Sequence, residues 1–220
     1  MSKLKSIFRE YRDSDYEICE ELVNNAWKFD SNFKPQKLAD LAKCIYTKGS
    51  VIGSNFRKVV EINGEVVGFI FGLNEATVKP KRDVLFGLSI LWRLLCIKGM
   101  TFKDKKKLIN AINTHEINRS KVVGRGKSEI VLFVVDPNHQ GFGNGKRLLS
   151  EFTSQCKKSG VKSIIVETNK LGASSFYEGV GFKHIANFDS PLHEYATKGG
   201  QACMYEYSLI EKNKIELGQS

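Results

Sequence analysis

A glycine-rich turn between an apolar run and a helical pattern is the segment of this 220-residue chain best suited to chemistry. Residues 130–135 (Ile-Val-Leu-Phe-Val-Val) predict a strand, and Pro137 stops it because proline cannot continue a ladder. Residues 140–145 then read Gln-Gly-Phe-Gly-Asn-Gly and lead into apolar residues at helical spacing. Such a turn exposes backbone N–H groups at the positive end of a helix dipole. It therefore predicts an anion site, most often for phosphate.

Spacing excludes two common phosphate loops. A dinucleotide fingerprint would need a glycine where the chain has Lys146, and a P-loop would need glycine and Ser or Thr where it has Gln140 and Arg147. What remains is Gln-x-x-Gly-x-Gly, which closely resembles the acetyl-CoA pyrophosphate loop of the GNAT superfamily of N-acetyltransferases. The alternative is a glycine-rich turn that binds nothing.

A second motif follows at the spacing that the family shows. Residues 161–168 predict another strand, and residues 169–182 resemble the GNAT signature Asn-x-x-x-Ala-x-x-Phe-Tyr-Glu-x-x-Gly-Phe. The matching residues are Asn169, Ala173, Phe176, Tyr177, Glu178, Gly181 and Phe182. Two motifs separated by a helix and a strand are more specific than either motif alone.

The remaining pattern alternates between strands and helices. A hairpin is predicted at Asn63-Gly64, between β-branched runs. Strands are expected over 5–11, 56–62, 65–73, 161–168, 182–188 and 201–210, and helices over 13–29, 35–47, 143–158 and 172–179. The GNAT resemblance implies a mixed α/β fold (α+β) with a central, mostly antiparallel sheet flanked by helices. It implies a single acetyltransferase domain over residues 1–220.

Residues 78–127 depart from the family, which usually has a short loop between the third and fourth strands. The segment holds 13 Lys and Arg against three acids, an excess of +10 that equals the net charge of the whole chain. Its apolar run, Val84–Ile97, is too short to span a bilayer, and a second helix is expected over 103–117. We interpret 78–127 as a basic helical insertion. It could pack on the core with a solvated basic face, form a lid that shapes the acceptor pocket and attracts an acidic substrate, or bind nucleic acid or a membrane surface. Its apolar run is expected to pack over the mouth of the acceptor cleft or against a second subunit.

Composition predicts a soluble protein of the cytoplasm. The chain is 41% hydrophobic and 26% charged, and its N-terminus has no long apolar core of the signal-peptide kind. Five scattered cysteines without a Cys-x-x-Cys pair indicate free thiols in a reducing compartment, and no metal site is predicted.

The resemblance implies transfer of the acetyl group of acetyl-CoA to an amine by direct attack in a ternary complex. It assigns acetyl-CoA contacts to Phe133, Val134, Val135, Gln140, Gly141, Phe142, Gly143, Asn144, Gly145, Lys146 and Asn169. Tyr177 would protonate the leaving thiolate, because a tyrosine is protonated at neutral pH, or would merely pack. Glu129 matches the base of the histone-acetyltransferase branch or is simply solvent-facing, and Glu167 is the reserve candidate. His139 is expected near the phosphates.

A second function stays open, namely a non-catalytic acyl-CoA-binding GNAT module that acts as a sensor or interaction domain. No cysteine aligns with the thioester, which disfavours a covalent relay. The sequence does not identify the amine acceptor. It leaves a homodimer open and contains no clear nucleic-acid or membrane motif.

Overall fold

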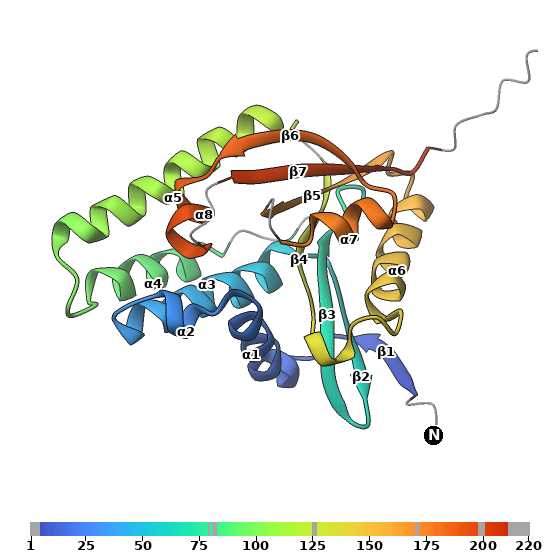
Figure 1. Cartoon of the computed structure of the whole chain (residues 1–220), viewed down its shortest axis with the longest axis horizontal. Helices are drawn as coiled ribbons and strands as arrows, with labels where there is room; N and C mark the ends of the chain where they lie inside the picture. Colours follow the sequence, from blue (N-terminus) through green and yellow to red (C-terminus); the bar gives the residue numbers. More distant parts are fainter. Residues whose placement is uncertain are drawn as a thin grey trace, which may run out of the picture.

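A seven-stranded sheet is the centre of the computed structural model (Figure 1). The structure describes residues 5–78, 80, 83–124, 127–169, 172–197 and 201–210. The strand order is β1-β2-β3-β4-β5-β7-β6. The predicted mixed α/β fold with a mostly antiparallel sheet is confirmed, since only β4 and β5 run parallel.

The first four strands form one half of the sheet. They are β1 (Ser6–Glu10), β2 (Phe56–Ile62), β3 (Glu65–Leu73) and β4 (Ser128–Val135). The turn between β2 and β3 has φ of 53° at Asn63 and 86° at Gly64. These left-handed values explain why an Asn-Gly pair makes this tight hairpin.

The second half comprises β5 (Ser163–Asn169), β6 (Lys183–Asp189) and β7 (Gln201–Ser208). The last strand lies between β5 and β6 and is antiparallel to both. Helix α6 (Asn144–Lys158) provides the crossover from β4 to the parallel β5.

Helices cover both faces of the sheet (Figure 1). One face carries α1 (Tyr16–Trp27), α2 (Phe29–Asn32), α3 (Gln36–Gly53) and part of α5 (Phe102–Val122), and its core includes Phe69, Phe71 and Val134. The other face carries α6 and α7 (Ser174–Gly179), with Ile70 and Phe152 in its core. Alternate residues of each strand therefore serve opposite cores, as the pleat requires.

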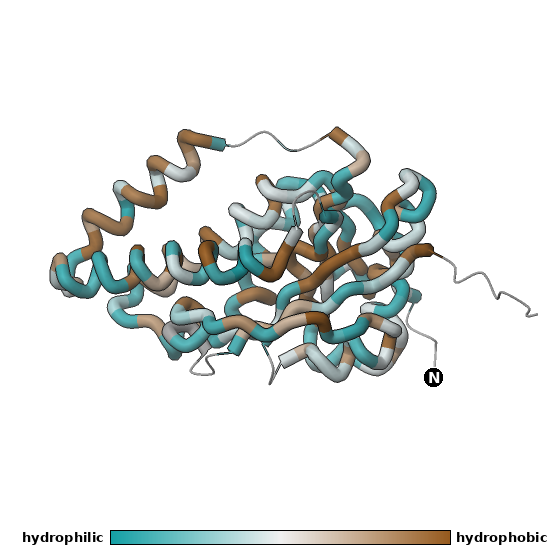
Figure 2. Tube along the Cα trace, turned by 90° about the horizontal axis from the view of Figure 1, so that it is seen from above, coloured by the Kyte–Doolittle hydropathy of each residue, from teal (hydrophilic) through white to brown (hydrophobic). Residues whose placement is uncertain are grey.

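Helices α4 (Val84–Leu95) and α5 lie between β3 and β4, within the range 78–127, and the reading of that range as a family-specific insertion stays a prediction. Figure 2 shows α4 as a largely hydrophobic helix. Leu94 is buried and Phe86 and Ile90 are half-buried, but six large side chains of α4 are exposed, namely Val84, Leu85, Leu88, Leu91, Trp92 and Leu95. Lys105 of α5 holds the end of α4 by donating from Nζ to the Leu95 carbonyl at 2.6 Å. Most of α4 is therefore not covered by other described residues, and its expected packing over the acceptor cleft or against a second subunit stays a prediction.

Two short helices were not predicted, namely α2 and a helix that follows β6. Helix α8 (Pro191–Thr197) lies between β6 and β7 and contacts α5. Its first turn is held by Ser190, whose Oγ accepts from the His193 N–H at 2.9 Å. Searched over the described residues, the helices include none with the length and apolarity needed to cross a membrane.

Candidate active site

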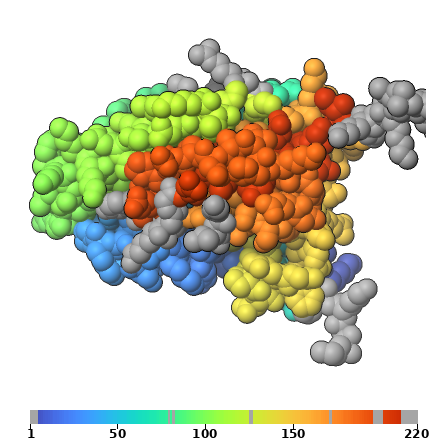
Figure 3. Space-filling view, turned by 45° about the horizontal axis from the view of Figure 1, so that its top comes forward, coloured from blue at the N-terminus to red at the C-terminus, as the bar shows by residue number. Residues whose placement is uncertain are grey.

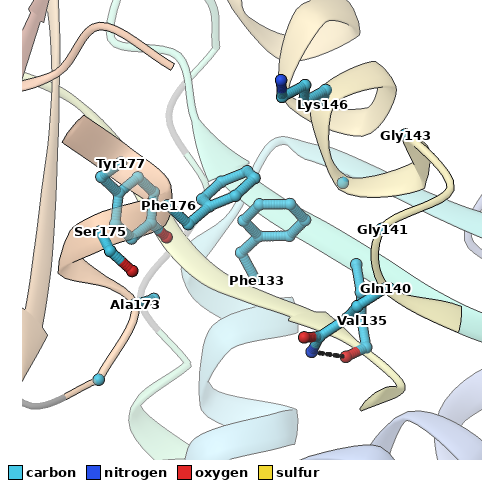
Figure 4. A pocket seen from close by; sticks show the side chains of 12 residues that line it. Phe133, Val135, Gln140, Gly141, Gly143, Lys146, Ala173, Ser175, Phe176 and Tyr177 are labelled. Atoms are coloured by element: carbon cyan, nitrogen blue, oxygen red, sulfur yellow. Dashed lines mark hydrogen bonds between the residues drawn. The ribbon is translucent and has the colours of Figure 1, made fainter. Parts of the chain in front are cut away.

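A cavity of about 680 Å³ lies where the end of β4, the glycine-rich turn, the start of α6 and the segment before and within α7 meet (Figure 4). Its lining is Phe133, Val135, Gln140, Gly141, Gly143, Gly145, Lys146, Gly172, Ala173, Ser175, Phe176 and Tyr177. The two sequence motifs thus face one another across a single cavity. Glycines and aromatic rings make up much of its wall, which leaves backbone groups accessible.

Separation of β4 from β5 opens one side of the cavity. The parallel pairing runs from Ser128 to Ile130, whereas β4 stays paired with β3 as far as Val135. Beyond Ile130, the β5-facing edge of β4 has no strand partner among the described residues. Peptide groups on such an edge can bind an extended ligand by hydrogen bonds. Strands β4 and β5 therefore diverge beyond Ile130.

The glycine-rich turn delivers backbone amides to the same cavity. Gly141 and Gly143 have φ of 81° and 83°, values that a side chain would strain. Gly143 is the N-cap of α6 and no side chain caps this helix, so its first-turn N–H groups face the cavity without a capping acceptor. The Gln140 Nε2 donates to the Val135 carbonyl at 2.9 Å, which ties the turn to the end of β4 (Figure 4). This backbone geometry suits an anion, and the anion site expected from the sequence stays a prediction.

Helix α7 supplies the opposite wall. Tyr177 is 5% exposed and packs between Phe176 and Phe182, with ring centroids 5.4 and 5.3 Å away. Burial raises the pKa of Tyr177 well above its ordinary value of 10.0. The hydroxyl is therefore protonated at neutral pH. Phe176 meets Phe133 edge to face at 5.7 Å, which joins α7 to β4 across the cavity.

Eight of the predicted site residues line the cavity: Phe133, Val135, Gln140, Gly141, Gly143, Gly145, Lys146 and Tyr177. The others do not. Val134 is buried in the core on the other face, Phe142 is 77% exposed, and Asn169 lies at the end of β5. The buried Asn144 side chain accepts from Ser6 and donates to the His139 carbonyl. Cofactor contacts by these four residues stay predictions, and so does that of His139, which faces a different hollow with Asp136.

The predicted base and its reserve share one partner outside the cavity lining. Arg119 of α5 donates from Nη2 to Glu129 Oε1 and from Nε to Glu167 Oε2, the latter at 2.9 Å. Burial raises the pKa of Glu129 against the opposing effect of Arg119. Burial also acts to raise the pKa of Glu167, but its hydrogen bond with His193 and nearby cations prevail, so this pKa is lowered. The base assignment stays a prediction.

Sequence reasoning missed several lining residues. Ser175 and Phe176 stand on the cavity side of α7 beside Tyr177 (Figure 4). Their motif, Ala-x-x-Phe-Tyr, contained a signal, because residues next to an expected site residue in one short helix share its surroundings. Arg119 carried no comparable signal, because the sequence does not distinguish it from the other 12 Lys and Arg residues of the segment 78–127.

The protein-family model described as "Acetyltransferase (GNAT) domain" matches residues 100–190, which include the glycine-rich turn and α7. Residues 100–190 of this chain are therefore similar to GNAT acetyltransferase domains. Solved structures share the fold: yncA of Salmonella typhimurium with its cofactor acetyl-CoA (16% identity, 97% of this chain and 99% of that one, TM-score 0.51). An N-acetyltransferase from Staphylococcus aureus Mu50 is 14% identical over 94% of this chain and 99% of that chain, with a TM-score of 0.53. Among curated protein sequences, none matches the chain.

Proposed function

We propose that this chain is a GNAT acetyltransferase that moves the acetyl group of acetyl-CoA to an amine. The observation that carries the proposal is the uncapped first turn of α6, which opens into the same cavity as the unpaired edge of β4. The first feature suits a pyrophosphate and the second an extended arm with amide groups. yncA, which has the same fold, is a structure with acetyl-CoA.

In this proposal the pyrophosphate binds the amides of residues 140–145, with Lys146 as a nearby cation. The pantetheine arm extends along β4 past Val135 and Phe133. The thioester then lies toward Tyr177, across the cavity from the turn. The apolar rings of Phe133 and Phe176 exclude water from that end, which strengthens hydrogen bonds to the reacting group.

The proposed reaction is a direct transfer. The amine nitrogen attacks the thioester carbonyl carbon, the tetrahedral intermediate collapses, and the carbon–sulfur bond breaks. Tyr177 donates its proton to the departing thiolate, for which its burial and raised pKa suit it. Glu129 receives the amine proton through water, because its carboxylate lies outside the cavity lining and Arg119 binds one of its oxygens.

Two measurements test the proposal. Calorimetry with acetyl-CoA measures binding, and thiol release from acetyl-CoA over a panel of small amines, polyamines and peptides measures transfer. Tyr177→Phe keeps the ring and removes the hydroxyl, so we expect normal binding and a loss of turnover of about 100-fold or more if chemistry limits the rate. Tyr205→Phe is the matched control, because Tyr205 lies in the same core cluster but outside the cavity lining.

The two variants separate chemistry from packing. Equal losses in both would mean that the Tyr177 hydroxyl acts only through stability. Binding of acetyl-CoA without thiol release for any amine would favour the non-catalytic acyl-CoA module. Failure of acetyl-CoA to bind would refute the proposal.

A further inference from the structure

Three side chains with metal-binding atoms converge on the side of the sheet away from α6 and α7. They are His115 of α5, Glu167 of β5 and His193 of α8, and their donor atoms all lie within 4.8 Å of one another. Glu167 Oε1 is 3.0 Å from His193 Nε2 and 3.7 Å from His115 Nε2. The carboxylate oxygen thus stands between two imidazole nitrogens.

These separations match a first coordination shell. Zinc binds imidazole nitrogen and carboxylate oxygen at about 2.0–2.2 Å, so two ligands of a tetrahedral site stand about 3.3 Å apart. The separations of 3.0 and 3.7 Å from Glu167 Oε1 to the two imidazole nitrogens lie on either side of that distance. Small side-chain rotations would bring all three atoms to one ion. Three protein ligands would leave a fourth position for water.

Surrounding hydrogen bonds orient the ligand atoms. The His115 Nδ1 lies 2.9 Å from Ser190 Oγ; with its proton on Nδ1, His115 donates there and presents the lone pair of Nε2. The same Ser190 Oγ accepts from the backbone N–H of His193. Glu167 Oε2 is held by Arg119 Nε at 2.9 Å, which leaves Oε1 toward the histidines. Partners of this kind are what fix ligand orientation in metal sites.

The local charge favours a divalent cation. Arg119 supplies one positive charge, and three glutamates supply one negative charge each, namely Glu116, Glu129 and Glu167. With both imidazoles neutral, the net charge of this cluster is −2. Glu116 stands at the rim, with Oε1 3.9 Å from His115 Nε2. His115 is only 7% exposed, so little water screens the charge of Glu167 beside it, whereas the charge of Glu116 is screened by solvent.

We propose that His115, Glu167 and His193 bind one zinc ion. The site would fasten α5 and α8 to β5, three elements distant in the sequence. Figure 3 shows the outer surface where α5 runs beside the strand that precedes α8. Because α8 is a single short helix between two strands, a bound metal ion would attach it to α5 and β5 in addition to its packing. The site is separate from the cavity between β4 and α7 and does not depend on acetyl-CoA.

The test uses the full chain, treated with a chelator and dialysed. Titration with Zn²⁺ by calorimetry is expected to give one site per chain, and Zn²⁺ is expected to raise the Tm as its concentration rises. Titration with Co²⁺ is expected to give the visible absorption of a tetrahedral complex without thiolate charge-transfer bands. His193→Gln and Glu167→Gln are each expected to weaken Zn²⁺ binding at least tenfold. His184→Gln is the matched control, because His184 pairs with Asn187 on β6 outside the cluster.

A variant that keeps all three ligands tests the site in case the ligand substitutions misfold the protein. Ser190→Ala keeps all three ligands but removes the oxygen that orients His115, so we expect about a tenfold weaker site. Absence of a 1:1 site in the parent protein would overturn the proposal and leave a hydrogen-bonded Glu–His cluster. Binding that survives both ligand substitutions, or that disappears when Cys44 and Cys96 are alkylated, would overturn it as well.

Discussion

An aspartate placed at Gly145 should separate folding from cofactor binding. Gly145 is the second residue of α6, and a Cβ built on it would lie 3.4 Å from the Phe133 ring and 3.6 Å from the Phe176 ring. Both rings line the cavity, so the new side chain points into it. The backbone there has no left-handed φ. Gly145→Asp therefore introduces charge without backbone strain.

The two expected effects of Gly145→Asp have opposite signs. A carboxylate in the first helical turn stabilises the helix by about 0.3–1 kcal/mol, and removal of a glycine from a helix adds about 0.5–1 kcal/mol. Against a phosphate about 4 Å away, the same charge costs about 1 kcal/mol in water and about 4 kcal/mol at an effective dielectric constant of about 20. Acetyl-CoA affinity should therefore fall by a factor of about 5 to 1,000 while the Tm holds or rises.

Gly145→Asn is the control, since it adds nearly the same bulk without charge. Calorimetry at low and high salt measures the ratio of the two acetyl-CoA dissociation constants, and thermal melting without ligand measures stability. The ratio should shrink at about 1 M salt, where charges are screened beyond about 3 Å. Equal affinities for the two variants at low salt would refute the pyrophosphate position.

Three further predictions concern stability. Lys105→Met should lower the free energy of unfolding by about 1 kcal/mol, measured by urea titration, because it removes the bond to the last turn of α4. Gly72→Ala should cost about 1–3 kcal/mol, because its Cβ would meet Phe152 at 2.5 Å, whereas Gly87→Ala, with no atom within 4 Å, should not destabilise. Burial acts to raise the pKa of Asp15, but the guanidinium of Arg9, 2.7 Å away, lowers it more, so the pKa of Asp15 lies below 3.8. The resulting stability is present above about pH 3.8 and is lost as the pH falls through the lower folded value, a loss that Asp15→Asn should remove from acid titrations.

Local chemistry made much of the fold readable from the sequence. The turn at Asn63-Gly64 needs left-handed backbone angles that few other residues adopt, and the glycines at 141 and 143 show the same requirement beside the cavity. Helix α8 was missed although Ser190-Pro191 is a good start signal, because seven residues carry too little periodicity. The cluster of His115, Glu167 and His193 could not be predicted, because no spacing rule joins three elements that meet only after the sheet has formed.

The position of β7 has a consequence for the order of folding. Residues 201–208 are synthesised after the other six strands that the structure describes, yet they form an interior strand that β5 and β6 flank. Until that strand inserts, β5 presents an open edge on that side and β6 has no partner among the strands described. During synthesis, the half of the sheet made of β5, β6 and β7 is therefore incomplete and open to wrong pairing until those residues leave the ribosome. Deletion of residues 201–208 would therefore separate β6 from the rest of the sheet, whereas deletion of an edge strand would leave the other strands paired.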